Sequence, residues 1–205
     1  MAEKKITGEV ERFSYALGMN IASNLIRSGI KTINPEAFVQ AINDTFVGNM
    51  PALMPDEANN IIEKFMQDRN AAEAEQNLNL GREFLAGNKK EEGVTELSNG
   101  LQYKVLKEGS GEKPTLNDQV KCHYKGTLID GTVFDSSIDR GEPAVFPVNG
   151  VIKGWVDALQ MMPVGSKWRL FVPHNLAYGN QGAGDVIGPN ATLVLDVELI
   201  EILNK

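Results

Sequence analysis

The segment that begins at Pro55 and extends to about Ala86 constrains the fold of this chain more than any other stretch. Two acidic residues follow Pro55, as is typical of a helix start, and neither proline nor glycine then occurs before Gly81. Both ends of the segment are apolar, whereas its middle, QDRNAAEAEQN, is polar on nearly all sides. A helix of this kind does not pack into a core. We therefore expect a solvated connecting helix of roughly 48 Å, at ~1.5 Å per residue, between two folded bodies.

The residues before this helix have helical periodicity. Residues 7–28 carry apolar side chains on two faces, and Asn34-Pro35-Glu36 predicts the start of a second helix that stops near Gly48. A unit of about 50 residues is marginal alone, and two apolar faces exceed what one neighbouring helix covers. We therefore expect residues 1–54 to form a homodimer. The alternative is that these helices pack on the second domain of their own chain.

After residue 90 the pattern changes to short β-rich runs separated by turns. These runs predict an antiparallel sheet, interrupted by one short amphipathic helix, VIKGWVDALQMM. The expected strands are LQYKVL, QVKCHYKGTL, TVFDSS, AVFPV, KWRLFV and ATLVLDVELIEI. The chain is thus predicted to be of the α+β class, with a helical domain over residues 1–54, a connecting helix over 55–90 and a compact sheet domain over 91–205.

Charge and cysteine content limit the partners and the compartment. The formal net charge of -7 and the pI near 5.0 argue against nucleic acid and anionic membranes as partners. The first residues, MAEKKITGEVERF, lack the apolar core of a signal peptide. The only cysteine, Cys122, alternates inward in VKCHYKG, so we expect it to be buried and reduced. We expect a cytoplasmic protein; a periplasmic location would require a presequence that has been removed.

The usual reactive constellations are missing from the sequence. Two histidines, His123 on the outer face of a predicted strand and His174 in a loop, cannot make a typical structural zinc site with one cysteine. The stretch GNQGAG is glycine-rich, but neither Gly-Lys-Ser/Thr nor a helix start follows it, which argues against a phosphate-binding loop. We therefore expect neither a metal ion nor a cofactor.

The stretch DGTVFDSS, residues 130–137, points to a different kind of site. Asp130-Gly131 predicts a two-residue hairpin turn, after which Phe134 lies on the returning strand. Asp135 follows at once, although aspartate is disfavoured in strands. Three more aromatic residues border glycines or turns, namely Tyr124, Trp155 and Tyr178. Each alone is usually a core residue, but several with one carboxylate predict an apolar concave site with few polar groups.

These residues lie in stretches that resemble the FKBP-type peptidyl-prolyl cis/trans isomerases. The stretches are VKCHYKGTLIDGTVFDSS, VIKGWVDALQMMPVGSKWRLFVP, LAYG and GPNATLVLDVELI, and the similarity covers about residues 100–203. The helices before them resemble the Mip-like (macrophage infectivity potentiator) subgroup, in which an N-terminal helical domain forms a homodimer and a long helix carries the isomerase domain. The resemblance implies an antiparallel sheet wrapped around the short helix, with a pocket between the two.

The same resemblance implies which residues form that pocket. Trp155 would lie beneath the proline ring, and Tyr178 would offer its hydroxyl to a substrate carbonyl. The full set implied as catalytic is Asp135, Tyr178, Phe134, Tyr124 and Trp155. The set implied as substrate-binding is Val151, Ile152, Ile187, Leu195 and Ala144. Ala144 and Leu195 stand where many relatives have aromatic residues, so we expect the immunosuppressive macrolides that inhibit this family to bind more weakly than in relatives with aromatic residues there.

We therefore expect the chain to isomerise Xaa-Pro bonds of unfolded or partly folded proteins and so to assist their folding. Turning such a bond requires no nucleophile, which agrees with the missing reactive residues. In this interpretation Asp135 is the polar wall of the pocket and accepts hydrogen bonds from neighbours such as Tyr124 and Arg140. The alternative is that its carboxylate caps the turn at Ser136-Ser137. The alternative function is a dimeric chaperone-like clamp that holds prolyl segments with little need for turnover.

Overall fold

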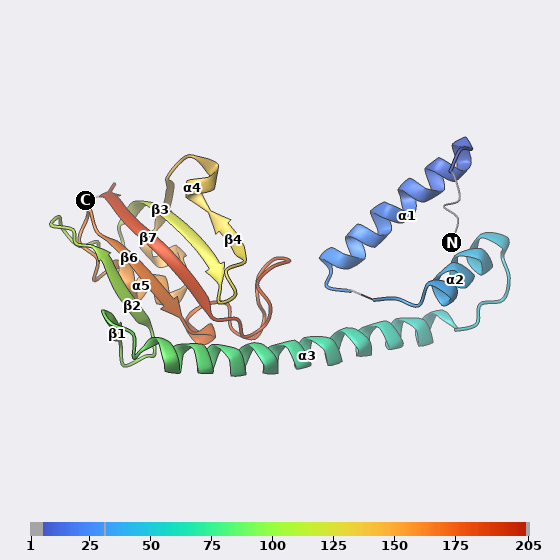
Figure 1. Cartoon of the computed structure of the whole chain (residues 1–205), viewed down its shortest axis with the longest axis horizontal. Coiled ribbons are helices and arrows are strands. Elements are labelled where there is room, and N and C mark those ends of the chain that lie inside the picture. Colours follow the sequence, from blue (N-terminus) through green and yellow to red (C-terminus); the bar gives the residue numbers. More distant parts are fainter. Residues whose placement is uncertain (1–5, 31, 204–205) are drawn as a thin grey trace. The chain divides into compact units, whose positions relative to one another are not determined.

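The structure is a computed structural model that describes residues 6–30 and 32–203 (Figure 1). The first five residues of the predicted helical domain therefore lie outside the described residues. Contacts between residues divide the chain into two compact units, residues 1–64 and 65–205. The division falls inside helix α3 (Pro55–Asn88), whereas the sequence places domain boundaries at 54/55 and 90/91.

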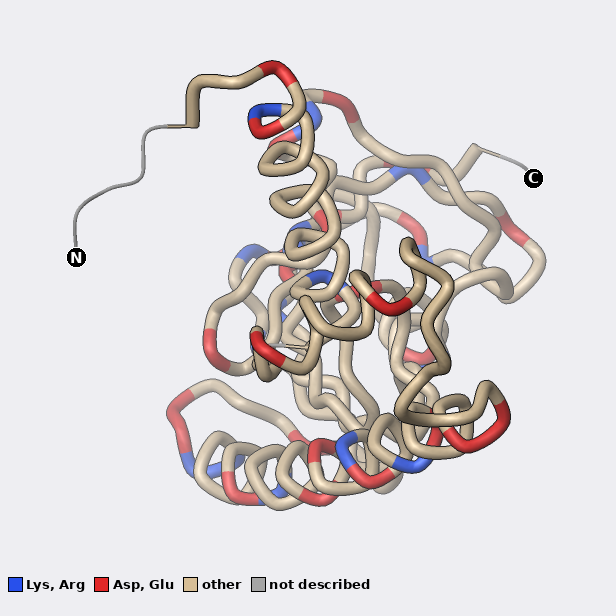
Figure 2. Tube along the Cα trace, turned by 90° about the vertical axis from the view of Figure 1, so that its right-hand side faces the viewer, with Lys and Arg blue, Asp and Glu red and all other residues tan. Residues whose placement is uncertain are grey.

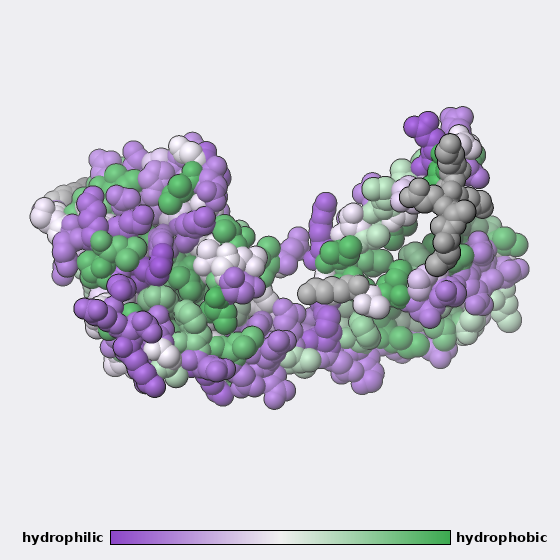
Figure 3. Space-filling view, viewed as in Figure 1, coloured by the Kyte–Doolittle hydropathy of each residue, from purple (hydrophilic) through white to green (hydrophobic). Residues whose placement is uncertain are grey.

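The first unit contains α1 (Glu9–Arg27) and α2 (Pro35–Val47), close to the two predicted helices. At the start of α2, Asn34 Oδ1 accepts a hydrogen bond of 2.9 Å from the N–H of Ala37. At its end, Gly48 adopts a left-handed conformation with φ of 75°. No residue of either helix is buried, and hydrophobic atoms lie at the surface of both (Figure 3). A single copy of this unit therefore leaves its apolar side chains in water.

Helix α3 is continuous over the predicted range, but it is solvated over less of its length than the polar sequence indicates. In the second unit, residues 74–77 of α3 contact loop residues 189–190, and the last turns of the helix pack on the sheet. Gly81 is buried there, and a Cβ added to it would meet Thr192 Oγ1 at 2.3 Å. Phe84 packs on Phe171, with 6.0 Å between the ring centroids. The expectation of a solvated connection is therefore corrected for the C-terminal part of α3, where small and aromatic residues face the sheet.

The second unit is built on one antiparallel sheet of seven strands. The strands are β1 (Val94–Glu96), β2 (Gln102–Lys107), β3 (Gln119–Leu128), β4 (Val133–Ser136), β5 (Ala144–Pro147), β6 (Lys167–Val172) and β7 (Leu193–Ile202). Their order is β1-β2-β6-β7-β3-β4, and β5 also pairs with β3. Both the predicted antiparallel sheet and the α+β class are confirmed. β3 pairs with more strands than its neighbours do: it pairs with β7 along its length and with β4 and β5 on its other edge.

Several short elements were not predicted. They are β1, α4 (Ser137–Arg140) and two 3-10 turns, η1 (Val148–Gly150) and η2 (His174–Leu176). Each has three or four residues, which is too short for a hydrophobic period to show in the sequence. η2 includes His174, which sequence analysis places in a loop.

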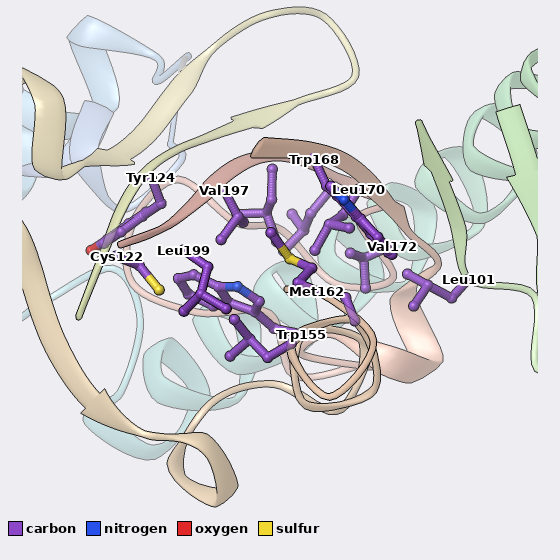
Figure 4. Close-up of a cluster of buried hydrophobic side chains, with 14 of the residues drawn as sticks. Leu101, Cys122, Tyr124, Trp155, Met162, Trp168, Leu170, Val172, Val197 and Leu199 are labelled. Carbon is purple, nitrogen blue, oxygen red and sulfur yellow. The ribbon is translucent and has the colours of Figure 1, made fainter. Parts of the chain in front are cut away.

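The core lies between the sheet and α5 (Lys153–Leu159), the predicted short helix (Figure 4). Trp155 and Leu159 of α5 point toward strand residues such as Val120, Leu170 and Val197. The buried position predicted for Cys122 is confirmed, since its exposed fraction is 0%. Burial raises the pKa of the Cys122 thiol to about 12, so the unreactive thiol form prevails at neutral pH.

Charged residues are spread over both units, and acidic ones predominate (Figure 2). Within residues 6–30 and 32–203, every helix is too short or too polar to cross a lipid bilayer. Over the same residues, His, Cys, Asp and Glu side chains do not gather in a group of three or more that could hold a metal ion.

Candidate active site

The hairpin between β3 and β4 explains how Asp135 comes to lie beside an aromatic ring. The N–H of Leu128 donates to Thr132 O at 2.9 Å, and the N–H of Gly131 donates to Leu128 O at 3.1 Å. The loop thus has three residues, 129–131, and not the two that the Asp-Gly pair predicts. Among the described residues of this loop only Gly131 has a positive φ, of 88°. A three-residue loop of this type is commonly followed by an irregular pairing register.

That irregularity lies at Phe134. Thr127 pairs with Val133 and Gly126 pairs with Asp135, so Phe134 is an extra residue between two pairs. A bulge of this kind redirects side chains that would otherwise alternate between the faces of the sheet. As a result, Phe134 and Asp135 both line one cavity. Gly126 makes room for the ring, since a Cβ on it would meet Phe134 Cζ at 2.4 Å.

The cavity has a volume of about 420 Å³. It lies between the sheet, α5, η1 and the segment that carries Tyr178. Of the ten predicted site residues, eight line it: Tyr124, Phe134, Asp135, Val151, Ile152, Trp155, Tyr178 and Leu195. Three lining residues were missed by sequence analysis: Phe146, Gly150 and Leu193. Phe146 and Leu193 are each two positions from a predicted residue on the same strand, so strand alternation is the signal that would have found them.

The structure does not bring Ala144 and Ile187 to this cavity. Ala144 is opposite Cys122 on β3 and packs against the core, while Phe146, two residues on, reaches the cavity. Ile187 is 8% exposed and belongs to the core, and its backbone pairs with Ala183. The resemblance implied both as wall residues. In the structure Ile187 belongs to the hydrophobic core and Ala144 packs against that core.

Three aromatic rings form the inner part of the cavity. The ring centroids of Tyr124 and Trp155 are 5.2 Å apart with an interplanar angle of 66°. Phe146 completes the group at 4.8 Å from Trp155. Edge-to-face and tilted contacts of this kind hold aromatic rings in fixed orientations. The Trp155 indole Nε1 is buried without a hydrogen-bond partner among the described residues.

One polar cluster stands at the edge of these rings. The Tyr124 hydroxyl donates to Asp135 Oδ2, Arg140 Nη1 donates to Asp135 Oδ1, and Arg140 Nη2 donates to Tyr124 Oη at 3.0 Å. The Arg140 guanidinium also lies 5.7 Å from the centroid of the Tyr124 ring. The cap of α4 is the Ser136 hydroxyl, which accepts from the N–H of Asp139 at 3.0 Å. The geometry thus favours a pocket wall for Asp135 over the capping alternative.

The hydrogen bonds of this cluster keep Asp135 ionised. Partial burial acts to raise the pKa of the Asp135 carboxyl group, but the hydrogen bonds from Tyr124 and Arg140 act in the opposite direction and prevail, so this pKa lies below its ordinary value. Burial raises the pKa of the Tyr124 phenol, and the hydrogen bond to Asp135 adds to this rise. At neutral pH this cluster therefore pairs the ionised carboxylate of Asp135 with the neutral phenol of Tyr124.

We expect kcat/KM for a prolyl peptide to vary little between about pH 6 and 8, because neither Asp135 nor Tyr124 titrates there. The pKa of Asp135 is lower in the folded chain than the value of about 3.9 in an unfolded chain. Its interactions therefore stabilise the fold above that value, and the contribution disappears as the pH falls through the lower folded-state pKa. A pH series of peptide isomerisation, with circular dichroism to follow folding, checks this. A steep change in turnover near pH 7 would contradict it.

A second cavity, of about 680 Å³, lies on the other face of the sheet, beside the end of α3. None of the predicted site residues line it. Its wall includes Lys104, Lys125 and the ion pair in which Arg169 contacts Asp196 at 2.6 Å. The smaller cavity is the better candidate, because it combines an apolar floor with a few convergent polar groups.

Comparisons with known proteins show which family the chain resembles. Residues 110–200 match the family described as "FKBP-type peptidyl-prolyl cis-trans isomerase", and residues 10–105 match the "Domain amino terminal to FKBP-type peptidyl-prolyl isomerase". The chain is 46% identical over 193 residues to the FKBP-type 22 kDa peptidyl-prolyl cis-trans isomerase of Escherichia coli (strain K12), an alignment that covers 93% of this chain and 94% of that protein. It is 41% identical over 204 residues to the outer membrane protein MIP of Legionella longbeachae, covering 96% and 87%.

A solved structure shares the fold as well. The crystal structure of FkpA from Escherichia coli matches with a TM-score of 0.71 and 35% sequence identity, and the match covers 97% of this chain and 98% of that one. The two matched families together, and each of the two named relatives, extend over the helical and the sheet units. The chain therefore belongs to the FKBP-type peptidyl-prolyl cis/trans isomerases and to their Mip-like group, whose members carry this amino-terminal domain.

Proposed function

We propose that this isomerase acts on Xaa-Pro bonds of unfolded or partly folded polypeptides, with the 420 Å³ cavity as its catalytic site. The observation that carries the proposal is the combination of an aromatic floor, formed around Trp155, with the ionised Asp135 at its edge. A proline ring is apolar, whereas the amide that precedes it is polar. The cavity offers an apolar surface for the first and polar neighbours for the second.

The chemistry of the reaction suits such a site. Resonance keeps the peptide bond planar with a barrier of ~18–20 kcal/mol, and uncatalysed exchange of an Xaa-Pro bond takes tens to hundreds of seconds. The planar amide is the more polar state, so an apolar cavity weakens its advantage over the twisted amide. Groups that fit the twisted carbonyl better than the planar one add selective stabilisation. No bond to the enzyme is formed or broken in this mechanism.

Each proposed catalytic residue then has a physical role. Trp155 forms the floor under the proline ring, and Phe134 covers one side. Asp135 orients Tyr124 through their hydrogen bond and faces the twisting amide with its negative charge. Tyr178, 41% exposed at the rim, offers its hydroxyl to a carbonyl of the substrate. Val151, Ile152 and Leu195 complete the apolar wall.

A protease-coupled assay on a short Xaa-Pro peptide tests the function directly. Acceleration of cis-to-trans exchange by the full chain, and its loss on addition of a macrolide that occupies the cavity, is the expected result. The alternative of a clamp without turnover is not favoured, because the relatives named above include a peptidyl-prolyl isomerase of similar length. Binding of the peptide, seen in tryptophan fluorescence, without any acceleration would support the clamp.

Assembly into a homodimer is the second part of the proposal, with residues 1–54 as the dimerisation domain, 55–90 as the connecting helix and 91–205 as the isomerase domain. It is supported by large apolar side chains that one copy leaves in water, such as Phe13 at 68% exposure and Phe46 at 86%. Exposed apolar surface on this scale is typical of an interface. Two linked sites would raise the effective concentration for a long client and so favour a chaperone-like action on refolding proteins.

Light scattering should show a dimer for the full chain at micromolar concentration and a monomer for a fragment of residues 65–205. The fragment removes the exposed helices α1 and α2 and leaves the sheet unit whole. We expect the two to have similar kcat/KM on short peptides but the full chain to be faster on a refolding protein. A monomeric full chain would overturn the proposed homodimer, but it would leave the proposed catalytic site unaffected.

The location of the protein and its inhibitors also belong to the proposal. A cytoplasmic location is supported by a single cysteine that is buried and unpaired. One relative is named an outer membrane protein, so fractionation of the producing cells is the test. Macrolides are proposed as inhibitors that bind more weakly than in relatives with an aromatic ring at the position of Leu195, which lines the cavity.

A further inference from the structure

The segment after Tyr178 is a long loop, residues 179–192, that returns to β7. Three glycines in it, Gly179, Gly182 and Gly184, have positive φ values of 61°, 66° and 56°. Glycine gives such a loop little intrinsic stiffness. The Tyr178 side chain itself makes no hydrogen bond to another described residue, so its position at the rim of the cavity depends on how the backbone next to it is held.

That backbone is held at Gly179 by two hydrogen bonds. The N–H of Gly179 donates to His174 O at 2.9 Å, and the carbonyl of Gly179 accepts from the N–H of Asn190 at 2.8 Å. The second bond closes the loop, since it joins the residue after Tyr178 to a residue close to the start of β7.

Asn190 has a second partner, on helix α3. Its side-chain Nδ2 donates to the carbonyl of Ala74 at 3.3 Å. Asn190 is also the only non-glycine residue with positive φ, 57°, in the described part of the chain. Asparagine is among the few residues that tolerate this conformation, which otherwise has a steric cost. One residue thus connects α3 to the backbone next to Tyr178, in a conformation that most residues would not adopt.

Helix α3 fits closely against the same loop at other points. Asn77 Nδ2 donates to Pro189 O at 2.9 Å. Near this bond, a Cβ added to Gly188 would meet Glu73 Oε1 at 2.3 Å and Asn77 Nδ2 at 3.0 Å, so helix and loop lie close together there. The contact between helix and loop therefore combines close approach with hydrogen bonding.

We propose that Asn190 is a positioning residue for catalysis, which ties helix α3 to Gly179 and so holds Tyr178 at the rim of the cavity. The inference rests on the proposed role of Tyr178 as a donor to the substrate. It makes the C-terminal half of α3 a part of the catalytic unit as well as a connection. The Tyr178 hydroxyl meets the substrate when the complex forms, so a loosened loop should act chiefly on KM.

The test is Asn190→Gly in the full chain. Glycine accepts the positive φ and keeps the backbone N–H that donates to Gly179, and only the bond to Ala74 is removed. We expect KM for a short prolyl peptide to rise about three- to tenfold, the factor that corresponds to one hydrogen bond, with kcat changed less than about twofold. Asn77→Ala removes the neighbouring hydrogen bond, from Asn77 on the helix to Pro189 O, and should also raise KM. This variant tests the inference even if Asn190→Gly folds poorly.

Asn180→Gly is the matched control. Asn180 is exposed in the same loop and its side chain makes no hydrogen bond to another described residue, so this variant adds the same flexibility of glycine without touching α3. It should keep the wild-type KM. Exchange of the backbone amide at position 190 should be faster in Asn190→Gly and in Asn77→Ala than in Asn180→Gly. The three variants should have equal thermal midpoints.

A double-mutant cycle with Tyr178→Phe shows whether the effect passes through Tyr178. We expect Asn190→Gly to add little once the Tyr178 hydroxyl is absent. An unchanged KM in Asn190→Gly, or the same fold-change with and without the hydroxyl, would overturn the inference alone. If Tyr178→Phe is as active as the wild type, the proposed role of Tyr178 fails and the inference fails with it; a wild-type chain without turnover would reject the proposed function as a whole.

Discussion

Asp135→Leu is expected to lower kcat/KM for a short prolyl peptide by several-fold to tens of fold, in a domain that remains folded. Leucine keeps the branch at Cγ, with a larger volume, but removes the carboxylate that accepts from Tyr124 and Arg140. Hydrogen bonds to a charged group contribute about 1.5–3 kcal/mol, and ~1.4 kcal/mol corresponds to a factor of ten. The Asp135 side chain is 42% exposed, so solvent screening places the expected loss toward the lower part of this range.

Two further variants separate the charge of Asp135 from its position. Asp135→Asn keeps an acceptor for the Tyr124 hydroxyl but removes the negative charge, so activity close to that of Asp135→Leu would assign the effect to charge. Asp139→Leu, on the exposed side of α4, is the matched control and should have nearly wild-type activity, because its carboxylate does not contact the cavity. Wild-type turnover in Asp135→Leu would remove the carboxylate from the mechanism.

The elements that carry a strong period were predictable from sequence. β3 has the predicted bounds, 119–128, because apolar and polar residues alternate through QVKCHYKGTL and one face is buried in the core. The starts of α2 and α3 were predictable because each helix has a proline at its first position. In α2 the proline follows the capping residue Asn34, and in α3 two acidic residues follow the proline. In each case the local chemistry and the tertiary packing favour the same structure.

The position of Asp135 was only half predictable. The Asp-Gly pair indicates a hairpin, but the three-residue loop shifts the register by one residue, and the bulge at Phe134 then decides which side chains face the cavity. A shift of one residue in a strand moves every side chain to the other face, so small errors in the loop have large effects on a predicted site. The pattern of aromatic residues beside one carboxylate predicts a concave site, and the resemblance to a family then assigns Phe134 and Asp135 to its wall.

The packing of α3 was beyond the sequence pattern. Its segment AAEAEQN is polar, and polar helices are usually solvated, but hydrogen bonds from Asn77 and to the Ala74 carbonyl fix it to the loop. Such bonds depend on partners more than 100 positions later in the chain, which no local period records. The same holds for Gly81, whose missing side chain leaves space for Thr192.

A fragment of residues 91–205 is expected to be less stable than a fragment of residues 65–205 by about 3–5 kcal/mol. The longer fragment keeps Phe84 on Phe171, a contact that leaves Phe171 only 6% exposed, and burial of such a side chain contributes about 1.5–3 kcal/mol. It also keeps two hydrogen bonds of the buried Gln102, to Leu85 O at 2.9 Å and from Asn88 at 2.8 Å, at about 1 kcal/mol each. For a domain of this size the loss corresponds to a thermal midpoint lower by roughly 10–20 °C.

Urea unfolding of the two fragments measures the difference, and two variants of the 65–205 fragment assign it. Phe84→Ala should lower the free energy of unfolding by a large part of the difference between the two fragments, because it removes the ring that covers Phe171. Leu80→Ala is the matched control on the same helix: Leu80 is 44% exposed, so its replacement should change the free energy of unfolding by less than about 1 kcal/mol. Equal stability of the two fragments would show that the sheet domain is complete from residue 91 and that α3 is bound to it only as a connection. A large difference would place residues 74–88 in the folding unit of the isomerase. The fragment of residues 91–205 lacks the helix that holds Asn190, so its KM for a short prolyl peptide should rise for the same reason as in Asn190→Gly.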